Sequence, residues 1–303
     1  MSWRSQVHLP GSQPGGDDTN AWTVLSPHID PSICRQTSGT TIAHYQFGDE
    51  SFEIKAKSRT DYLLSFSDIV HFLVNQEAMT VQPVCRRQDE LELVGLLLAN
   101  SVSAFLLSLR GSVALHASAV VVNEQAIVIC GPSNQGKSTL AAALCAAGAA
   151  LLTDDTLAWH DDTTRALAYR GVTDIRLRQP AAKLARTFGT ASRSPDGRLV
   201  VRPRVAQGNV VPIALVVHPT NQPNTLTPST VLLGGTRAHA PLLAATRIGS
   251  WTTNQQRIKA LKSAHRLAQL CRNVELTVSL RNTSSPEARH TLLQVLQNAA
   301  ENS

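Results

Sequence analysis

The sequence lacks the features that mark several large classes of protein. Its 303 residues include five cysteines, odd in number and without CxxC or Cys/His metal-ligand spacing, which favours a reducing compartment over a disulfide framework. No apolar run approaches the ~20 residues of a membrane span, and the first residues after Met1 lack the apolar core of a signal peptide. No block of like charges indicates a nucleic-acid tail. We therefore expect a soluble cytoplasmic protein that engages neither membrane nor nucleic acid.

A glycine-rich loop is the strongest motif in the chain. The apolar run 126–130 predicts a buried strand, and Gly-x-x-x-x-Gly-Lys-Ser follows directly, leading into a predicted helix. The two glycines allow the loop to curl, and the helix N-terminus favours phosphate. We expect Lys137 to reach the β- and γ-phosphates of a nucleotide and the Ser138 hydroxyl to bind Mg²⁺. The predicted nucleotide contacts are Gly131, Pro132, Ser133, Asn134, Gln135, Gly136, Lys137, Ser138 and Thr139.

Two adjacent carboxylates follow the predicted loop and helix. Asp154 and Asp155 end a short predicted strand at residues 150–153. A nucleotide-bound Mg²⁺ needs a hard oxygen ligand besides Ser138, and a phosphoryl acceptor needs a base. The pair satisfies both needs. The pattern leaves the assignment open, and we favour Asp154 as the base and Asp155 as the metal ligand.

A basic segment lies further along the chain. Residues 170–204 contain nine basic and two acidic residues, a net charge of +7, against +6 for the whole chain. An arginine fork suits a transferring phosphate, and other cations attract an acidic substrate. Arg176 is the favoured phosphate ligand, because a strand-like Ile-Arg-Leu sequence fixes its direction. The turn-rich stretch 192–198 predicts an exposed loop.

The chain order indicates an α/β protein with a small β-rich N-terminal part. Residues 1–40 are rich in Gly, Pro, Ser and Asp and predict a flexible arm. Residues 41–111 predict a hairpin, two more strands and an amphipathic helix over 89–109. Residues 112–303 predict the domain that carries the glycine-rich loop. Its later part contains a strand near 213–217, a helix over 253–272, a strand over 274–280 and a last helix over 285–301.

Three stretches together resemble the HPr kinase/phosphorylase family and its small stand-alone relatives. They are LHASAVVV from Leu115, GPSNQGKST from Gly131 and LLTDDTLAW from Leu151. The resemblance implies a P-loop kinase core, also similar to ATP-dependent phosphoenolpyruvate carboxykinase, that uses ATP and Mg²⁺ to phosphorylate a seryl hydroxyl. It also implies that His116 lies near the γ-phosphate and the base.

The resemblance has departures that bear on the substrate. The family's Glu-Ile-Arg-Gly signature is represented by Asp174, Ile175, Arg176 and Leu177, and the N-terminal hundred residues are unlike the family's regulatory domain. Some stand-alone relatives are lasso-peptide kinases that phosphorylate a precursor peptide. The expected partner is therefore a peptide or protein with an acceptor serine rather than HPr itself, and the chain is a candidate homo-oligomer.

Three other functions remain open from the sequence. The first is a kinase of a free small molecule such as serine, or carboxykinase-like chemistry. The second is a nucleotide-dependent switch or transport ATPase, against which stands the absence of LSGGQ and NKxD motifs. The third is a nucleotide binder without activity, which the intact Lys137, Ser138, Asp154 and Asp155 disfavour.

Overall fold

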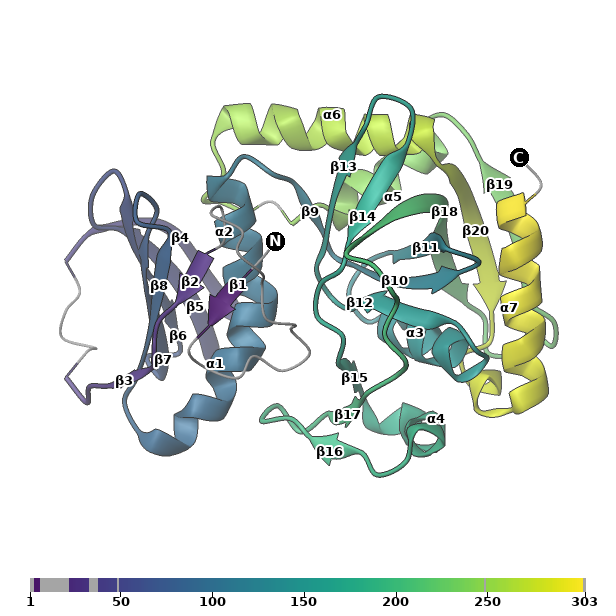
Figure 1. The fold of residues 1–303 in the computed structure, drawn as a ribbon, viewed down its shortest axis with the longest axis horizontal. Coiled ribbons are helices and arrows are strands. Elements are labelled where there is room, and N and C mark those ends of the chain that lie inside the picture. The colour runs from purple at the N-terminus through teal and green to yellow at the C-terminus, as the bar shows by residue number, and fades with distance from the viewer. Residues whose placement is uncertain (1–2, 6–21, 33–37, 48, 248, 302–303) are drawn as a thin grey trace. The chain divides into compact units, whose positions relative to one another are not determined.

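A computed structural model describes residues 3–5, 22–32, 38–47, 49–247 and 249–301 (Figure 1). The chain divides into two compact units, each described here by itself. Unit 1 comprises Met1–Gly111 together with Ile248–Gln255, and unit 2 comprises Ser112–Arg247 together with Gln256–Ser303. The division predicted from the sequence did not assign residues 248–255 to unit 1. Most of the predicted arm, residues 6–21 and 33–37, lies outside the described residues.

Unit 1 is built on an eight-stranded sheet. Its order is β1-β2-β8-β7-β6-β5-β4, with β3 also paired to β8. The meander from β4 to β8 is antiparallel and follows the alternation of apolar and polar residues along each strand. The predicted hairpin and the two predicted strands after it are present, whereas β6 was missed. The strands are β1 (Trp3–Ser5), β2 (Trp22–Val24), β3 (His28–Ile29), β4 (Thr40–Phe47), β5 (Glu50–Ala56), β6 (Asp61–Phe66), β7 (Val70–Asn75) and β8 (Thr80–Cys85).

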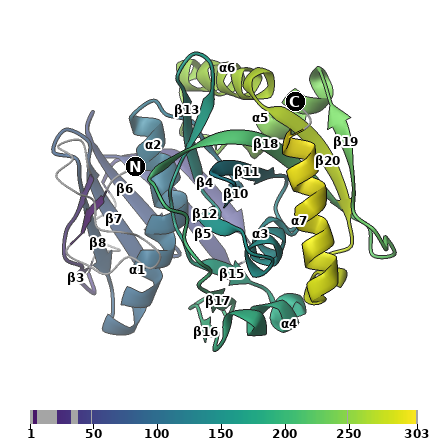
Figure 2. The ribbon, with the colours of Figure 1, turned by 45° about the vertical axis from the view of Figure 1, so that its right-hand side comes forward.

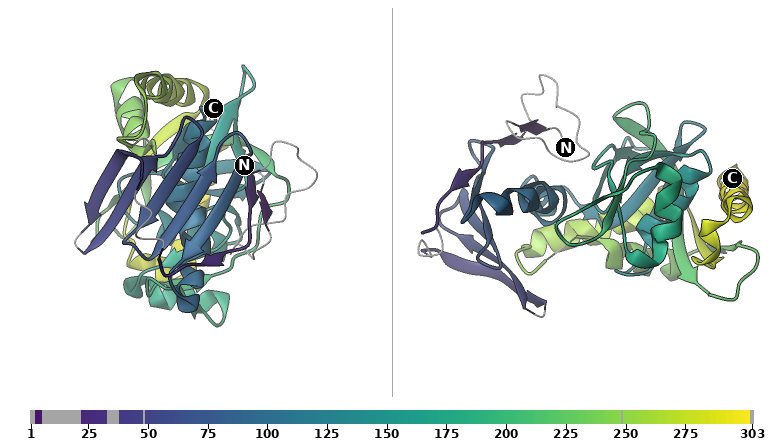
Figure 3. Two further views of the ribbon diagram at one scale, coloured as in Figure 1. Left: turned by 90° about the vertical axis from the view of Figure 1, so that its left-hand side faces the viewer. Right: turned by 90° about the horizontal axis from the view of Figure 1, so that it is seen from below.

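One helical run covers a face of this sheet (Figure 3, right). It passes through η2 (Gln88–Glu90), α1 (Leu91–Leu97), the π-helical turn η3 (Leu98–Val102) and α2 (Ser103–Leu109). By length and composition alone this run, Gln88–Leu109, could cross a membrane, so our expectation that no segment approaches that length was wrong. More than half of its most apolar window is buried, and its apolar side chains form the core of unit 1.

The returning segment of unit 1 contributes a tryptophan to the same core. The Trp251 ring meets Tyr45, Phe52 and Phe105 edge to face at centroid distances of 5.9, 6.2 and 6.1 Å. Its indole Nε1 donates to Ser108 Oγ at 3.2 Å. Edge-to-face aromatic pairs add to the stabilisation that area burial gives. These contacts explain why residues far apart in the sequence belong to one unit.

Unit 2 contains a nine-stranded mixed sheet. Its order is β12-β10-β11-β18-β14-β13-β9, and β20 pairs with β18 and with the edge strand β19. Strands β11, β18 and β20 are mutually parallel, so their carboxyl ends lie at one edge of the sheet. The strands are β9 (Ala114–Leu115), β10 (Ala117–Val122), β11 (Gln125–Cys130), β12 (Ala150–Thr153), β13 (Leu157–Asp161), β14 (Ala166–Tyr169), β18 (Val210–Asn221), β19 (Ser229–Leu233) and β20 (Arg272–Val278).

Helices cover both faces of this sheet (Figures 1 and 2). One face packs against α3 (Lys137–Ala146) and α7 (Pro286–Glu301), and the other against α5 (Thr236–Ala245) and α6 (Asn254–Leu270). The alternation within β11 explains both cores, because Ile127 and Ile129 enter the first while Val128 enters the second. Unit 2 is therefore a three-layer α/β structure, the class that the sequence predicts.

A small antiparallel sheet packs against the core that contains α3 and α7. Its order is β15-β17-β16, with β15 (Ile175–Leu177), β16 (Ser192–Arg193) and β17 (Leu199–Val201). The short helices η4 (Gln179–Ala181), α4 (Ala182–Ala185) and η5 (Arg186–Phe188) connect β15 to β16. Figure 2 shows these elements grouped at the bottom of the view. The predicted loop 192–198 is therefore the hairpin between β16 and β17.

Candidate functional site

The glycine-rich loop connects β11 to α3, as the sequence predicts. Gly136 has φ +82° and Asn134 has φ +69°, both in the left-handed region that lets the chain curl back into the helix. A Cβ at Gly136 would lie 2.2 Å from Leu280 Cδ1, so the loop also depends on the close approach of the segment after β20. Any side chain at residue 136 would be both strained and crowded.

Lys137 is the buried cation of this loop. Its residue is 5% exposed, and Nζ donates to the carbonyl oxygens of Gly131 and Pro132 at 2.9 Å each. Burial lowers the pKa of Lys137, and Asp155 opposes that shift. An ammonium group has three N–H donors, and two of those of Lys137 are used by main-chain carbonyls. The third is available to a phosphate bound in the loop at the start of the helix.

Asp154 is the buried member of the carboxylate pair. It is 4% exposed, and Ser118 Oγ on β10 donates to its Oδ1 at 2.5 Å. The Ser138 hydroxyl at the start of α3 lies near this carboxyl group and favours its ionised form. Burial, followed by repulsion from Asp155, raises the pKa of Asp154 despite these two hydroxyls. Among the described residues, no cation forms an ion pair with Asp154.

Asp155 is the accessible member of the pair. Its side chain is 22% exposed, and its φ of +72° turns the chain away from Asp154 so that the two carboxyl groups have different partners. Its Oδ1 lies 2.9 Å from His116 Nδ1 and 2.8 Å from Arg247 Nη2, and its Oδ2 lies 3.8 Å from Arg176 Nη2. His116 Nδ1 and Arg247 Nη2 also approach the carbonyl oxygen of Asp155, each at 3.0 Å.

These neighbours determine the charge of Asp155. Burial alone would raise its pKa, but Arg247, His116 and Arg176 together hold the pKa of Asp155 well below its ordinary value. Asp155 is therefore ionised throughout the neutral range, while the pKa of Asp154 is shifted in the opposite direction. Two neighbouring carboxyl groups whose environments separate their pKa values are typical of catalytic sites.

Arg176 links this carboxylate to the small sheet. Besides its approach to Asp155, its Nη1 donates to Asp196 Oδ2 at 2.9 Å. Asp196 lies in the β16–β17 turn, where Arg198 Nε also reaches it at 3.2 Å. The turn that the sequence presented as an exposed loop therefore helps to orient Arg176.

The structure brings the predicted residues of unit 2 together and adds others. Lys137, Ser138, Asp154, Asp155, His116 and Arg176 come from four segments of the chain and lie around the carboxylate pair. Sequence reasoning missed Ser118, Arg247 and Asp196. Ser118 stands two residues after His116 on a strand, so a period-of-two argument could have found it. Arg247 had no signal, because it lies within a stretch, 228–250, that could not be assigned to a helix or strand from the sequence.

Gly171 supports the turn that carries both carboxylates. A Cβ at this position would lie 2.3 Å from Thr153 Oγ1, which donates to the Thr156 carbonyl oxygen at 2.9 Å across the turn. We expect Gly171→Ala to displace Thr153 and to lower the free energy of unfolding by about 1–3 kcal/mol. Urea denaturation measures this loss. Gly234→Ala is the control, because residue 234 has no steric neighbour within 4 Å and its φ lies outside the left-handed region. Equal losses in the two variants would contradict the steric argument.

Arg247 allows a pH test of its pairing with Asp155. We expect Arg247→Gln to be about 1–3 kcal/mol less stable than the wild type at neutral pH, because it removes one close cationic partner of a partly exposed carboxylate. The pKa of Asp155 is lowered in the folded wild type, so its contribution to stability is present above the ordinary carboxyl range and is lost as the pH falls. Denaturation measured over a pH series should therefore show that the difference in unfolding free energy between the wild type and Arg247→Gln becomes smaller as the pH falls. A difference that does not change with pH would argue against this pairing.

The donor atoms at this site fit a magnesium ion that also binds phosphate. The Ser138 hydroxyl and the Asp154 carboxylate are hard oxygen donors that lie near each other. In the described part of the chain, no group of three or more His, Cys, Asp or Glu side chains could hold a metal ion by itself. A Mg²⁺ ion here would take its other ligands from water and from nucleotide phosphates, as it commonly does.

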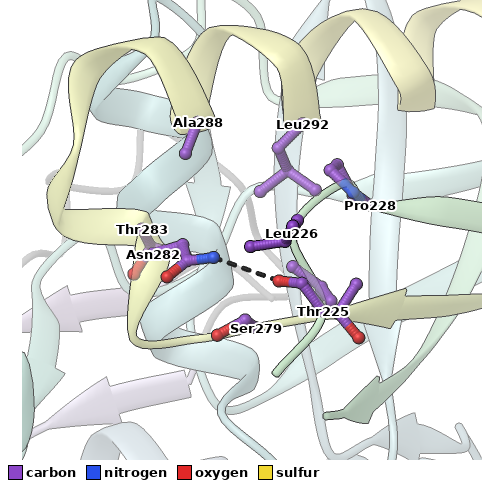
Figure 4. A pocket seen from close by; sticks show the side chains of 9 residues that line it. Thr225, Leu226, Pro228, Ser279, Asn282, Thr283, Ala288 and Leu292 are labelled. Carbon is purple, nitrogen blue, oxygen red and sulfur yellow. Dashed lines mark hydrogen bonds between the residues drawn. The ribbon is translucent and has the colours of Figure 1, made fainter. Parts of the chain in front are cut away.

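A small pocket of unit 2 lies away from these residues, beyond the carboxyl ends of β18 and β20 (Figure 4). Asn282 Nδ2 donates to the Thr225 carbonyl oxygen across it at 3.1 Å. Its volume of about 10 Å³ admits a single water molecule, so it is not a substrate site in this structure. Its lining residues are Thr225, Leu226, Pro228, Val278, Ser279, Asn282, Thr283, Ala288 and Leu292.

Comparisons with known proteins identify no family for the chain. No family model matches the sequence, and no curated protein matches it. Among solved structures, the HPr(Ser) kinase/phosphatase from Coxiella burnetii is similar over 62% of this chain and 99% of its own, with a TM-score of 0.36 and 14% sequence identity. This distant structural similarity is too low for any function to be inferred from it.

Proposed function

We propose that this protein is an ATP-dependent kinase that transfers the γ-phosphoryl group to a seryl hydroxyl of a peptide or protein. The observation that carries the proposal is the pair Asp154 and Asp155 beside the glycine-rich loop, one buried against Ser138 and the other accessible and ionised. A site that only hydrolyses or binds nucleotide needs the loop and one metal-binding carboxylate. The second carboxylate, held by His116, Arg176 and Arg247, supplies a base for an acceptor hydroxyl.

The environments of the two carboxylates favour the reverse of the assignment that the sequence favoured. Asp154 lies near Ser138 and is 4% exposed, whereas the Asp155 side chain is 22% exposed and is therefore the more accessible of the two to an acceptor hydroxyl. We assign Asp154 with Ser138 to Mg²⁺, whose charge would compensate the buried carboxylate and neutralise phosphate charge. Asp155, with an accessible carboxylate, is assigned as the base. His116 and Arg247 orient it by binding the same oxygen, Oδ1.

The reaction then divides its tasks among this chain's own residues. Asp155 accepts the proton of the seryl hydroxyl as the hydroxyl oxygen bonds to the γ-phosphorus, and the bond from that phosphorus to the bridging oxygen breaks to release ADP. Lys137 stabilises negative charge on the phosphates from within the loop. Arg176, already directed towards Asp155, is placed to balance charge on the transferred group.

Transfer of label from γ-labelled ATP tests the proposed function. The acceptors are peptides encoded beside this protein, each compared with its serine-to-alanine counterpart, with free serine as a third acceptor. We expect label on the serine peptide alone. Label on free serine only would make the protein a small-molecule kinase, and release of phosphate with no labelled acceptor in the presence of every peptide would favour an ATPase or switch.

A further inference from the structure

The positive charge of the whole chain is concentrated in one segment of unit 2. Residues 170–204 carry a net charge of +7 from nine basic and two acidic residues, whereas the chain carries +6, so all other residues together carry −1. Most of these cations are exposed. The excess positive charge is therefore local to this segment of the chain.

Strand β15 places its arginines on one face of the small sheet. Ile175 and Leu177 are buried in the core beside α3, and the alternation of a strand sends Arg176 and Arg178 to the opposite face. Arg176 is the residue that approaches Asp155 of the proposed site. On the outward face of β15, Arg176 therefore lies next to Asp155, the proposed base, and Arg178 is the next residue of that face along the chain.

The neighbouring strand β17 extends this face. Its register pairs Leu177 with Leu199, and Arg178 and Arg198 are the next residues beyond this last pair. Arg202 follows the other end of β17. Its Nε lies 3.3 Å from Asp174 Oδ1, and its side chain is 70% exposed. We call Arg176, Arg178, Arg198 and Arg202 the arginine face.

Three arginines of the arginine face have acidic partners within the fold, because Arg176 and Arg198 pair with Asp196 and Arg202 pairs with Asp174. Neighbouring like charges on a sheet are destabilising. Arg178, in contrast, is exposed and makes no ion pair with any described residue. An exposed, uncompensated arginine beside other arginines costs stability and increases the attraction of negative ligands.

We propose that the arginine face binds an acidic stretch of the polypeptide substrate, next to its acceptor serine. The inference rests on the proposed function, because Arg176 joins the face to the base. A peptide fits better than a nucleic acid. Segment 170–204 contains one aromatic residue, Phe188, which packs against the core, so the face lacks the exposed rings on which single-stranded bases stack.

Charge reversal at Arg178 tests the proposal. The probes are a short fluorescent peptide with glutamates around a central serine and its counterpart with glutamines. The full-length wild type should bind the glutamate peptide more tightly, and added salt should remove the difference. Arg178→Glu should weaken glutamate-peptide binding about three- to tenfold, and adding Arg202→Glu should weaken it further. Lys259→Glu, an equal change on an exposed part of α6, is the matched control.

The outcomes separate this inference from the proposed function. Equal binding of the two peptides by the wild type, or equal losses in Arg178→Glu and Lys259→Glu, would overturn the arginine face as a docking surface. Tighter binding of a single-stranded oligonucleotide than of the glutamate peptide would assign the face to nucleic acid instead. Binding of the glutamate peptide without its phosphorylation by ATP would leave the docking surface standing and reject the kinase.

Discussion

Replacement of Asp155 by Asn should lower the rate of phosphoryl transfer about 10²- to 10⁴-fold, the range in which a positioned general base contributes. Asn keeps the size of the side chain and can accept hydrogen bonds from His116 and Arg247, but it cannot take the proton of the acceptor. Because Asp155 does not contact the loop serine, we expect the variant to bind Mg²⁺–ATP with nearly the affinity of the wild type. Single-turnover transfer and nucleotide titration measure the two quantities separately.

Asp154→Asn is the matched comparison. This substitution removes the Asp154 carboxylate, which lies near Ser138 and is almost fully buried. We expect it to weaken the dependence of nucleotide binding on Mg²⁺, whereas Asp155→Asn leaves that dependence intact. The reverse pattern, with transfer lost in Asp154→Asn at full Mg²⁺–ATP affinity, would restore Asp154 as the base and reject our assignment.

Replacement of Lys137 by Met should lower transfer about 10²- to 10³-fold without a loss of stability. Removal of one preorganised donor to a developing negative charge costs a factor of this size. Lys137 is 5% exposed, and its ammonium group makes no hydrogen bond to a carboxylate. Removing this charge from water therefore lowers the stability of the folded protein when no nucleotide is bound. Met fills a similar volume without a charge, and we therefore expect the apo variant to be at least as stable as the wild type.

Thermal and urea unfolding of the apo protein, with the transfer assay, check this combination. Lys137→Arg serves as the control that retains the charge while changing its shape. A variant Lys137→Met that loses stability but retains transfer would show that the lysine serves the fold, and it would remove the loop from the proposed mechanism. Stability of the wild type should rise with added ATP and Mg²⁺, whereas that of the Met variant should respond little.

The sequence predicted the elements whose pattern is local. The hairpin between β4 and β5, the strand–loop–helix around Lys137 and the long helices α6 and α7 were predicted because periodicity, glycines and turn residues act over a few neighbours. Their bounds differ from the prediction by a few residues. The long helix of unit 1 was also predicted, but its π-helical turn at Leu98–Val102 was not, because no proline or glycine in that stretch marks it.

The candidate site was predictable where the residues form a motif and not where they only meet in space. Lys137, Ser138 and the two aspartates stand at fixed spacings, so their neighbourhood follows from one strand, one loop and one helix. Arg247 reaches Asp155 from a position 92 residues later in the chain, after a helix that carries a proline in its interior. No local pattern reports such a contact.

By itself, then, the sequence determined that unit 2 is α/β, that a nucleotide loop opens α3 and that two carboxylates accompany it. The tertiary structure decided how those carboxylates differ. Burial and the neighbouring Asp155 raise the pKa of Asp154 against the effect of the Ser118 and Ser138 hydroxyls, whereas Arg247, His116 and Arg176 lower that of Asp155 against the effect of burial. Desolvation and charge proximity depend on atoms brought together from distant segments, and adjacent residues in a sequence carry no record of them.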